Sequence, residues 1–291
     1  MSSIRLALAC AAFSVFVVPS ALAHGRVGDR FFPATIAVED PVAADELSFP
    51  TANLQDGESE YELEWAKRIT PRLAFSLGSA YVRGDEGDGS GNLETGLKYQ
   101  FYTDEAHESV LAAGVDVEWG GTGASRVGAE EVTTIAPILY FGRGFGDSSA
   151  DWLRPVAVTG SLAYVQGLRD RTDDGDVVPH SVSYGLTLQY SLPYLAAQVH
   201  DYGWPRWVNR LTPIVEVAID QPVANRGDER TTGTINPGLL WSGRYVQLGA
   251  EAIIPINDAS GDSVGAALQL HFYVDDLFPH SIGRPLFGAR P

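Results

Sequence analysis

The feature that most restricts the fold of this chain is an alternation of apolar and polar residues, which recurs from residue 58 onward. In the segment Glu60–Trp65, acidic residues alternate with Tyr, Leu and Trp. In the segment Val182–Tyr190, Val, Tyr and Leu alternate with Ser, Gly, Thr and Gln. A period of two gives a β-strand one apolar and one polar face. Segments of about ten residues with this alternation, separated by turn residues, are typical of transmembrane β-barrels.

Eleven segments carry this alternation, and the character of their connections predicts a twelfth strand. The segments are 59–69, 72–83, 92–102, 110–119, 132–143, 152–165, 181–192, 210–220, 231–241, 245–255 and 264–274. Loops rich in Gly and Asp, such as Gly84–Gly89 and Asp170–Asp176, alternate with the other connections, and we assign them to the outside of the cell. The strand at 59–69 then runs toward the periplasm, so an earlier strand, Glu46–Leu54, must run outward. The sequence predicts an all-β fold, a transmembrane antiparallel up-and-down β-barrel of about 12 strands over residues 46–274.

Three segments are predicted to lie outside the barrel. Arg5, an apolar run over Leu6–Val18 and the small-residue site Ala21–Ala23 predict a secretory signal peptide over residues 1–23, cleaved after Ala23. Residues 24–45 are expected to form an N-terminal arm, either periplasmic or lumenal, and residues 275–291 form a C-terminal tail.

One connection, over residues 193–209, is longer than the others on its side and contains Trp204 and Trp207. Two interpretations stay open for it. It forms a short amphipathic helix whose tryptophans lie at the membrane interface, or it is a disordered inner loop.

Composition excludes several classes of function. The chain has 20 Lys and Arg against 37 Asp and Glu, a formal net charge of -17 and no basic cluster, which argues against binding to nucleic acid. Its one cysteine, Cys10, lies in the predicted signal peptide, so no thiol chemistry, disulfide or cysteine-ligated metal is expected in the exported chain. No apolar stretch reaches the length of about 18 residues that a transmembrane helix needs. No cofactor is predicted.

Strand parity predicts a charged inner face and an apolar outer face on which Leu97, Val117, Leu186 and Leu268 contact lipid. Besides Glu60 and Arg154, the residues predicted to line the lumen are Glu62, Glu64, Glu94, Lys98, Asp116, Glu118, Glu216, Asp220, Glu251 and His271. Buried charges without partners are costly, so this face must contact water, paired charges or a solute. Either the acids line a wet passage, or they pair with Arg26, Arg30 or other arginines of the arm in a plugged lumen.

The chain resembles a known family in its arm Arg30–Thr35, in its repeated strands and in its ending Gln269–Tyr273. These features are similar to those of bacterial outer-membrane β-barrel proteins of the transporter type, such as the barrels associated with the meta-cleavage pathway of phenol degradation. The resemblance implies a passive channel or transporter for small solutes in the bacterial outer membrane. It implies contacts with outer-membrane lipid, with lipopolysaccharide and with the barrel-assembly machinery. Outer-membrane barrels usually finish at an aromatic residue, whereas here Tyr273 is followed by the tail.

Other functions remain open at the level of sequence. A soluble exported β-sandwich or lipid-binding barrel also has alternating strands. A barrel that transports nothing is the main alternative, either as a structural or adhesive envelope protein or as a surface hydrolase that uses His180 and Ser181. His24 has the chemistry to chelate copper as an N-terminal residue but has no assignable partner. The loop Asp85–Asp88 lacks the spacing of an EF-hand, so it indicates at most weak contact with divalent cations.

Overall fold

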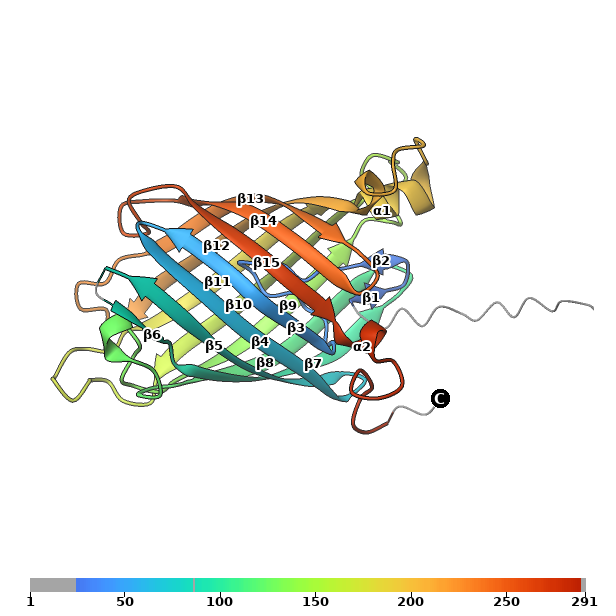
Figure 1. The fold of residues 1–291 in the computed structure, drawn as a ribbon. Coiled ribbons are helices and arrows are strands. Elements are labelled where there is room, and N and C mark those ends of the chain that lie inside the picture. Colours follow the sequence, from blue (N-terminus) through green and yellow to red (C-terminus); the bar gives the residue numbers. More distant parts are fainter. Residues whose placement is uncertain (1–24, 86, 289–291) are drawn as a thin grey trace, which may run out of the picture.

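Twelve long strands in the described part of the chain, residues 25–85 and 87–288 of a computed structural model, form one closed barrel (Figure 1). They are β3 (Glu46–Gln55), β4 (Glu58–Thr70), β5 (Leu73–Gly84), β7 (Leu93–Asp104), β8 (Ser109–Trp119), β9 (Thr134–Gly144), β10 (Val156–Gly167), β11 (His180–Tyr190), β12 (Leu211–Ala224), β13 (Thr232–Ser242), β14 (Val246–Pro255) and β15 (Gly265–Tyr273). Neighbouring strands are antiparallel, and the pairings of β3 with β15 and of β4 with β5 complete the ring. The predicted all-β barrel of twelve antiparallel strands is confirmed. The predicted signal peptide and His24 lie outside the described residues.

The remaining elements are short. They are β1 (Arg26–Val27), β2 (Arg30–Phe31), β6 (Gly87–Ser90), η1 (Ser125–Val127), α1 (Leu192–Tyr194), η2 (Leu195–Val199), η3 (Val208–Arg210) and α2 (Val274–Leu277). In the described ranges, no helix is long and apolar enough to cross a membrane. The connection at 193–209 combines brief helical turns with irregular chain, and both Trp204 and Trp207 are exposed.

Two local expectations need correction. Arg154 was expected in a strand that points inward, but β10 begins at Val156, and Arg154 lies in the preceding turn, where its Nε donates to the carbonyl of Gly146 at 3.2 Å. Pro155 follows Arg154 and has no N–H for a strand ladder, which is consistent with the later start. The Gly/Asp-rich segment after β5 was expected to be a loop, but part of it forms the short strand β6, which pairs with β5.

The connections divide between the two ends of the barrel. The inner end, on the right of Figure 1, holds β1, β2, α1, α2 and the turns after β4, β7, β9 and β13. The outer end holds β6 and the longer connections after β8, β10, β12 and β14. The arm and the tail therefore share one end, and the loops rich in Gly and Asp lie at the other.

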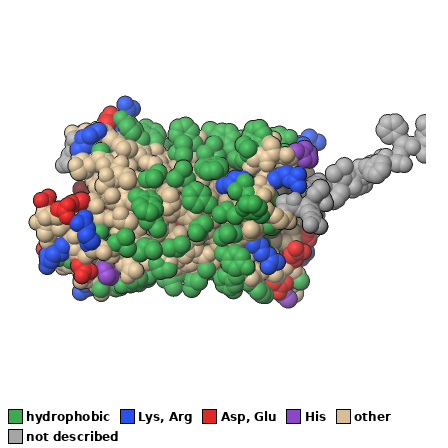
Figure 2. Space-filling model, turned by 90° about the horizontal axis from the view of Figure 1, so that it is seen from below, with side chains coloured by type: hydrophobic (Ala, Val, Ile, Leu, Met, Phe, Trp, Pro, Cys, Tyr) green, Lys and Arg blue, Asp and Glu red, His purple; other side chains and the backbone are tan. Residues whose placement is uncertain are grey.

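The outer surface carries an apolar belt. Space-filling atoms show hydrophobic side chains over the middle of the visible face and charged side chains at its two ends (Figure 2). Leu97, Leu186 and Leu268 are 43–49% exposed, while the neighbouring side chain of Thr187 is fully buried inside. The alternation in the sequence thus becomes an apolar exterior and a polar interior, as a bilayer requires.

The arm enters the barrel and fills its inner half. Val27, Phe32 and Val42 of the arm pack with Val110 of β8 and Ala157 of β10 in a cluster in which every member is at most 5% exposed. This contact brings apolar arm residues against the wall strands inside the barrel. The inner half of the lumen is consequently packed like a protein core.

The tail is anchored to the inner end of β4. Asp45, at the end of the arm, is fully buried, forms an ion pair with Lys67, and accepts a hydrogen bond of 2.6 Å from Nε of Arg68. The backbone N–H of Leu286 donates to the carbonyl of Arg68 at 3.1 Å, and that of Phe287 donates to Ile69 at 2.8 Å. The end of the arm and the tail thus meet on the same strand.

Candidate functional site

The centre of the arm is held by one carboxylate. The Glu216 side chain on β12 is fully buried and accepts backbone hydrogen bonds from Ile36 at 2.9 Å and from Ala37 and Val38 at 3.0 Å. Thr187 on β11 donates its hydroxyl to the same carboxylate at 3.0 Å. A carboxylate that receives several N–H groups is strongly stabilised without a cationic partner. Glu216 therefore fixes three consecutive arm residues across the lumen.

Other wall strands hold the arm on either side of Glu216. Gln247 of β14 donates to the carbonyl of Ala34 at 2.5 Å, and Gln269 of β15 donates to Thr35 at 3.3 Å. These bonds fix the approach of the arm to the centre. In the sheet, β13 separates β14 and β15 from β12, which carries Glu216. The arm is therefore tied to separate parts of the wall.

Beyond Val38, the arm reaches the opposite wall. Glu39 accepts a hydrogen bond of 2.7 Å from the hydroxyl of Tyr140 on β9 and forms an ion pair with Lys98 on β7. Lys98 also donates to the carbonyl of Asp40 at 2.8 Å. The segment 35–40 is thus tied from β15 and β12 to β9 and β7, and it forms a bar across the barrel.

Glycines on the wall make room for this bar. A Cβ built on Gly185 of β11 would lie 2.7 Å from both methyl carbons of Val38, and one on Gly249 of β14 would lie 2.8 Å from Cδ1 of Ile36. Such distances are shorter than the van der Waals contact distance between two carbon atoms. The arm therefore lies directly on the backbone of these strands.

The inner end of the arm is held by Arg30. Its guanidinium is fully buried and forms an ion pair of 3.1 Å with Glu108, donates to the carbonyls of Pro155 at 3.1 Å and Arg154 at 2.5 Å, and lies 3.8 Å from the ring centre of Tyr194. In the plugged alternative, an arm arginine pairs with the predicted lumenal acids, whereas Arg30 pairs with Glu108 at the inner end.

An acidic cavity of about 390 Å³ lies on one side of the bar, against β4, β5, β7 and β8. The acids that line it are Glu39, Glu62, Glu64, Glu94 and Asp116. Glu94 is the second residue of β7, so the cavity extends toward the outer end. Four of the predicted lumenal acids thus share one space, together with Glu39 of the arm.

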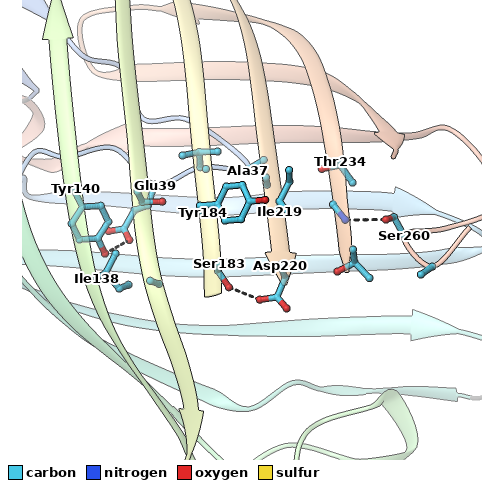
Figure 3. Close-up of a pocket in the computed structure, with 18 residues that line it drawn as sticks. Ala37, Glu39, Ile138, Tyr140, Ser183, Tyr184, Ile219, Asp220, Thr234 and Ser260 are labelled. Atoms are coloured by element: carbon cyan, nitrogen blue, oxygen red, sulfur yellow. Dashed lines mark hydrogen bonds between the residues drawn. The ribbon is translucent and has the colours of Figure 1, made fainter. Parts of the chain in front are cut away.

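A second cavity of about 640 Å³, the hydroxyl-lined pocket, lies on the other side of the bar, against β9–β13 (Figure 3). Its polar side chains are Glu39, Tyr140, Ser161, Ser183, Asp220, Thr232, Thr234 and Ser260. Asp220 is the predicted lumenal acid found here, and its Oδ2 accepts hydrogen bonds from Ser183 and, at 2.9 Å, from Ser181. Ala37 and Glu39 border both cavities.

The remaining predicted residues lie elsewhere in the interior. Glu118 accepts a hydrogen bond of 2.8 Å from the amide of Asn92. Glu251 is 5% exposed and lies beside the side chains of Glu216 and Asn236. His271 is 1% exposed; its Nδ1 lies 2.8 Å from Oγ of Ser48, and its Nε2 lies 3.3 Å from Glu46. Glu216, Glu251 and His271 are therefore buried, unlike the acids of the two cavities.

The residue pair considered for hydrolysis does not form a catalytic arrangement. His180 contacts the Tyr164 hydroxyl at 3.1 Å, whereas Ser181 donates to Asp220 in the interior. The hydroxyl proton of Ser181 is directed at Asp220 and not at His180, so His180 is not placed to activate Ser181. Within the described residues, no group of three or more His, Asp or Glu side chains is arranged to hold a metal ion.

Sequence reasoning missed Glu39, Tyr140 and the pair of Arg30 with Glu108. Glu39 lies in an irregular segment where no period exists to assign its direction. Tyr140 lies on β9 with the same parity as Ile138, and its role depends on the contact with Glu39, which sequence alone does not show. The signal that could have located the arm is the run of glycines on the inner faces of the strands.

A closed antiparallel barrel with an apolar belt outside and polar side chains inside defines an outer-membrane β-barrel. No family model and no curated protein matches the sequence. Among solved structures, the chain is similar to the KdgM porin, with a TM-score of 0.50 at 10% identity over 78% of this chain and 98% of that one. It is also similar to the NanC porin, with a TM-score of 0.51 at 8% identity over the same shares. For the COG4313 outer membrane channel from Pseudomonas putida F1, the TM-score is 0.47 at 17% identity, over 84% of this chain and 98% of that one. The likeness to KdgM and NanC supports the expected porin-like barrel at the level of the fold.

Proposed function

We propose that the protein is an outer-membrane channel for small solutes, that it prefers cations, and that the N-terminal arm is its constriction. The observation that carries this proposal is the acidic cavity, in which five carboxylates face one space. Lys98 contacts these five acids through its ion pair with Glu39. Several like charges in a confined space of low dielectric concentrate counter-ions and repel ions of their own sign.

The size of the barrel supports a narrow passage. Barrels of about eight strands are filled by side chains, whereas those of about 16 to 18 strands enclose an aqueous channel. Twelve strands lie between these limits, and the bar formed by the arm narrows the interior further. The solute must therefore be small.

Reversal potentials under a salt gradient test the selectivity of the refolded channel. The wild type should prefer K⁺ to Cl⁻, and this preference should fade at molar salt, where the screening length is about 3 Å. The combined variant Glu62→Gln, Glu94→Gln and Asp116→Asn removes three charges with little change in volume, so selectivity should fall. Glu251→Gln is the matched control, because it removes a buried carboxyl outside the acidic cavity. Preference for anions, or a combined variant that behaves like the control, would contradict the proposal.

A closed barrel is the second candidate, because the inner half of the lumen is packed. The cluster of Val27, Phe32, Val42, Val110 and Ala157 leaves these side chains at most 5% exposed. In this case the cavities receive a solute from outside without passing it on. Absence of conductance in the wild type, together with conductance in a chain lacking residues 25–42, would favour the closed barrel.

A further inference from the structure

We infer that the hydroxyl-lined pocket is a binding subsite for a small aliphatic amine, whose ammonium group lies at Asp220. This inference deepens the proposed function, because it names a class of solute for the lumen, and it rests on that proposed function. The pocket lies beside the bar and toward the outer end, since Ser260 in the connection after β14 is part of its lining (Figure 3).

The hydrogen-bond pattern around Asp220 leaves one oxygen for a ligand. Ser181 and Ser183 both donate to Oδ2. Oδ1 accepts no hydrogen bond from the described residues. Because the two hydroxyl protons are directed at Asp220, the serine oxygens offer lone pairs to other groups. Asp220 and its serines therefore present acceptors, and a positively charged donor complements them best.

Two further hydroxyl groups of the pocket also direct their protons at protein acceptors. Tyr140 donates its hydroxyl proton to Glu39 at 2.7 Å, and Ser260 donates its own to Asn257 at 2.9 Å. No Lys, Arg or His side chain is among the described residues that line the pocket. A carboxylate or phosphate solute would meet like charge without a cationic donor, so it is disfavoured. A neutral polyol is matched less well, because it brings no positive charge to the Asp220 carboxylate.

The rest of the lining is apolar and suits an alkyl chain. Val38 lies on Gly185, and Ile138, Ala163 and Ala218 complete a surface of methyl and methylene groups. Ala218 lies two residues before Asp220 on β12, so this surface adjoins the carboxylate on the same face of the strand. A metal ion needs several oxygens that converge on one point, whereas the pocket combines one free carboxylate oxygen with apolar surface. This combination selects an organic cation.

Calorimetric titration of the refolded full-length barrel with butylamine and with butanol tests the inference, because the two probes have similar length and differ in charge. Butylamine should bind saturably to the wild type, and butanol should not. Asp220→Asn keeps the volume but removes the charge, so it should weaken butylamine binding at least about tenfold, which is about 1.4 kcal/mol. Asp151→Asn is the matched control, since Asp151 is an exposed acid in the connection before β10 at the inner end, outside the pocket, and it should bind as the wild type does.

Equal butylamine affinity in wild type and Asp220→Asn, or equal binding of butanol, would overturn the inference. If Asp220→Asn does not fold, Ala218→Lys is the second variant. It places an ammonium group of the protein beside Asp220 and should abolish butylamine binding; unchanged binding would again overturn the inference.

Failure of this inference is distinguishable from failure of the channel. The combined variant of the acidic cavity should lose ion selectivity yet retain butylamine binding, because its three residues do not line the hydroxyl-lined pocket. Asp220→Asn should show the reverse. A barrel that binds butylamine but conducts no ions would refute the proposed channel and leave the subsite in place.

Discussion

At the scale of single residues, the interior uses its acids in two distinct ways. Glu216 is fully buried, yet its charge is balanced by N–H groups of three arm residues and a hydroxyl. Glu62 and Glu94 instead face a cavity together with other acids. Parity gives these three residues the same inward direction, so parity alone does not distinguish an anchor from a lining residue. The difference arises from the arm, which covers Glu216 and leaves the outer acids open.

Asp40 of the arm gives a prediction about pH. Its Oδ1 accepts the N–H of Val42 at 2.8 Å, and burial raises the pKa of Asp40 to about 7, against the opposing effect of Lys98, from an ordinary value of 3.8. The folded state therefore holds a proton that the unfolded chain releases, and stability falls as the pH rises from about 4 to about 7. Asp40→Asn imitates the protonated form. The variant should match the wild type near pH 4 and exceed its stability near pH 8, by on the order of 1–4 kcal/mol.

Denaturant unfolding of the refolded barrel at the two pH values measures this difference. The comparison with the variant isolates Asp40 from the other acids, whose titration is common to both proteins. A stability difference between the two proteins that is the same at both pH values would exclude the titration of Asp40 as its cause.

At the scale of strands, adjacent residues on β10 provide a matched test of the two faces. Leu162 is 51% exposed on the apolar belt, whereas Ser161 lines the hydroxyl-lined pocket. Leu162→Arg places a charge in lipid near the middle of the strand and should destabilise the barrel by about 2–4 kcal/mol. Ser161→Arg should cost much less, because its side chain reaches water and Asp220. Folding titrations in lipid vesicles check both variants, and equal losses of stability would contradict the assigned faces.

The strands were predictable because their signal is local, whereas the path of the arm was not. Alternation located β11 at 181–192, and the structure has it at His180–Tyr190. The arm has no such period, and its main anchor joins Ile36 to Glu216, 180 residues away. The sequence showed that the inner face is rich in Gly and acids. It did not show that Gly185 receives Val38, because that contact depends on the fold of the whole barrel.

At the scale of the whole molecule, the question is whether the arm must move for a solute to pass. The packed inner half indicates that it must, since the cavities described above lie beside and beyond the bar while Arg30 and Phe32 are buried. A tether between arm and wall tests this directly. A Cβ on Gly185 would lie 3.2 Å from Cβ of Val38, close to the separation of about 3.5–4.5 Å that disulfides adopt. The predicted mature chain has no other cysteine, because Cys10 lies in the signal peptide.

The double variant Val38→Cys and Gly185→Cys should therefore lose ion conductance in planar bilayers when oxidised and regain it when a reductant opens the disulfide. The two single variants are the controls, and their conductance should not respond to the reductant. A sustained current through the oxidised double variant, equal to that of the reduced form, would show that ions pass beside a stationary arm. Silence in both forms, with the single variants also silent, would identify the arm as a permanent plug and the barrel as a closed one.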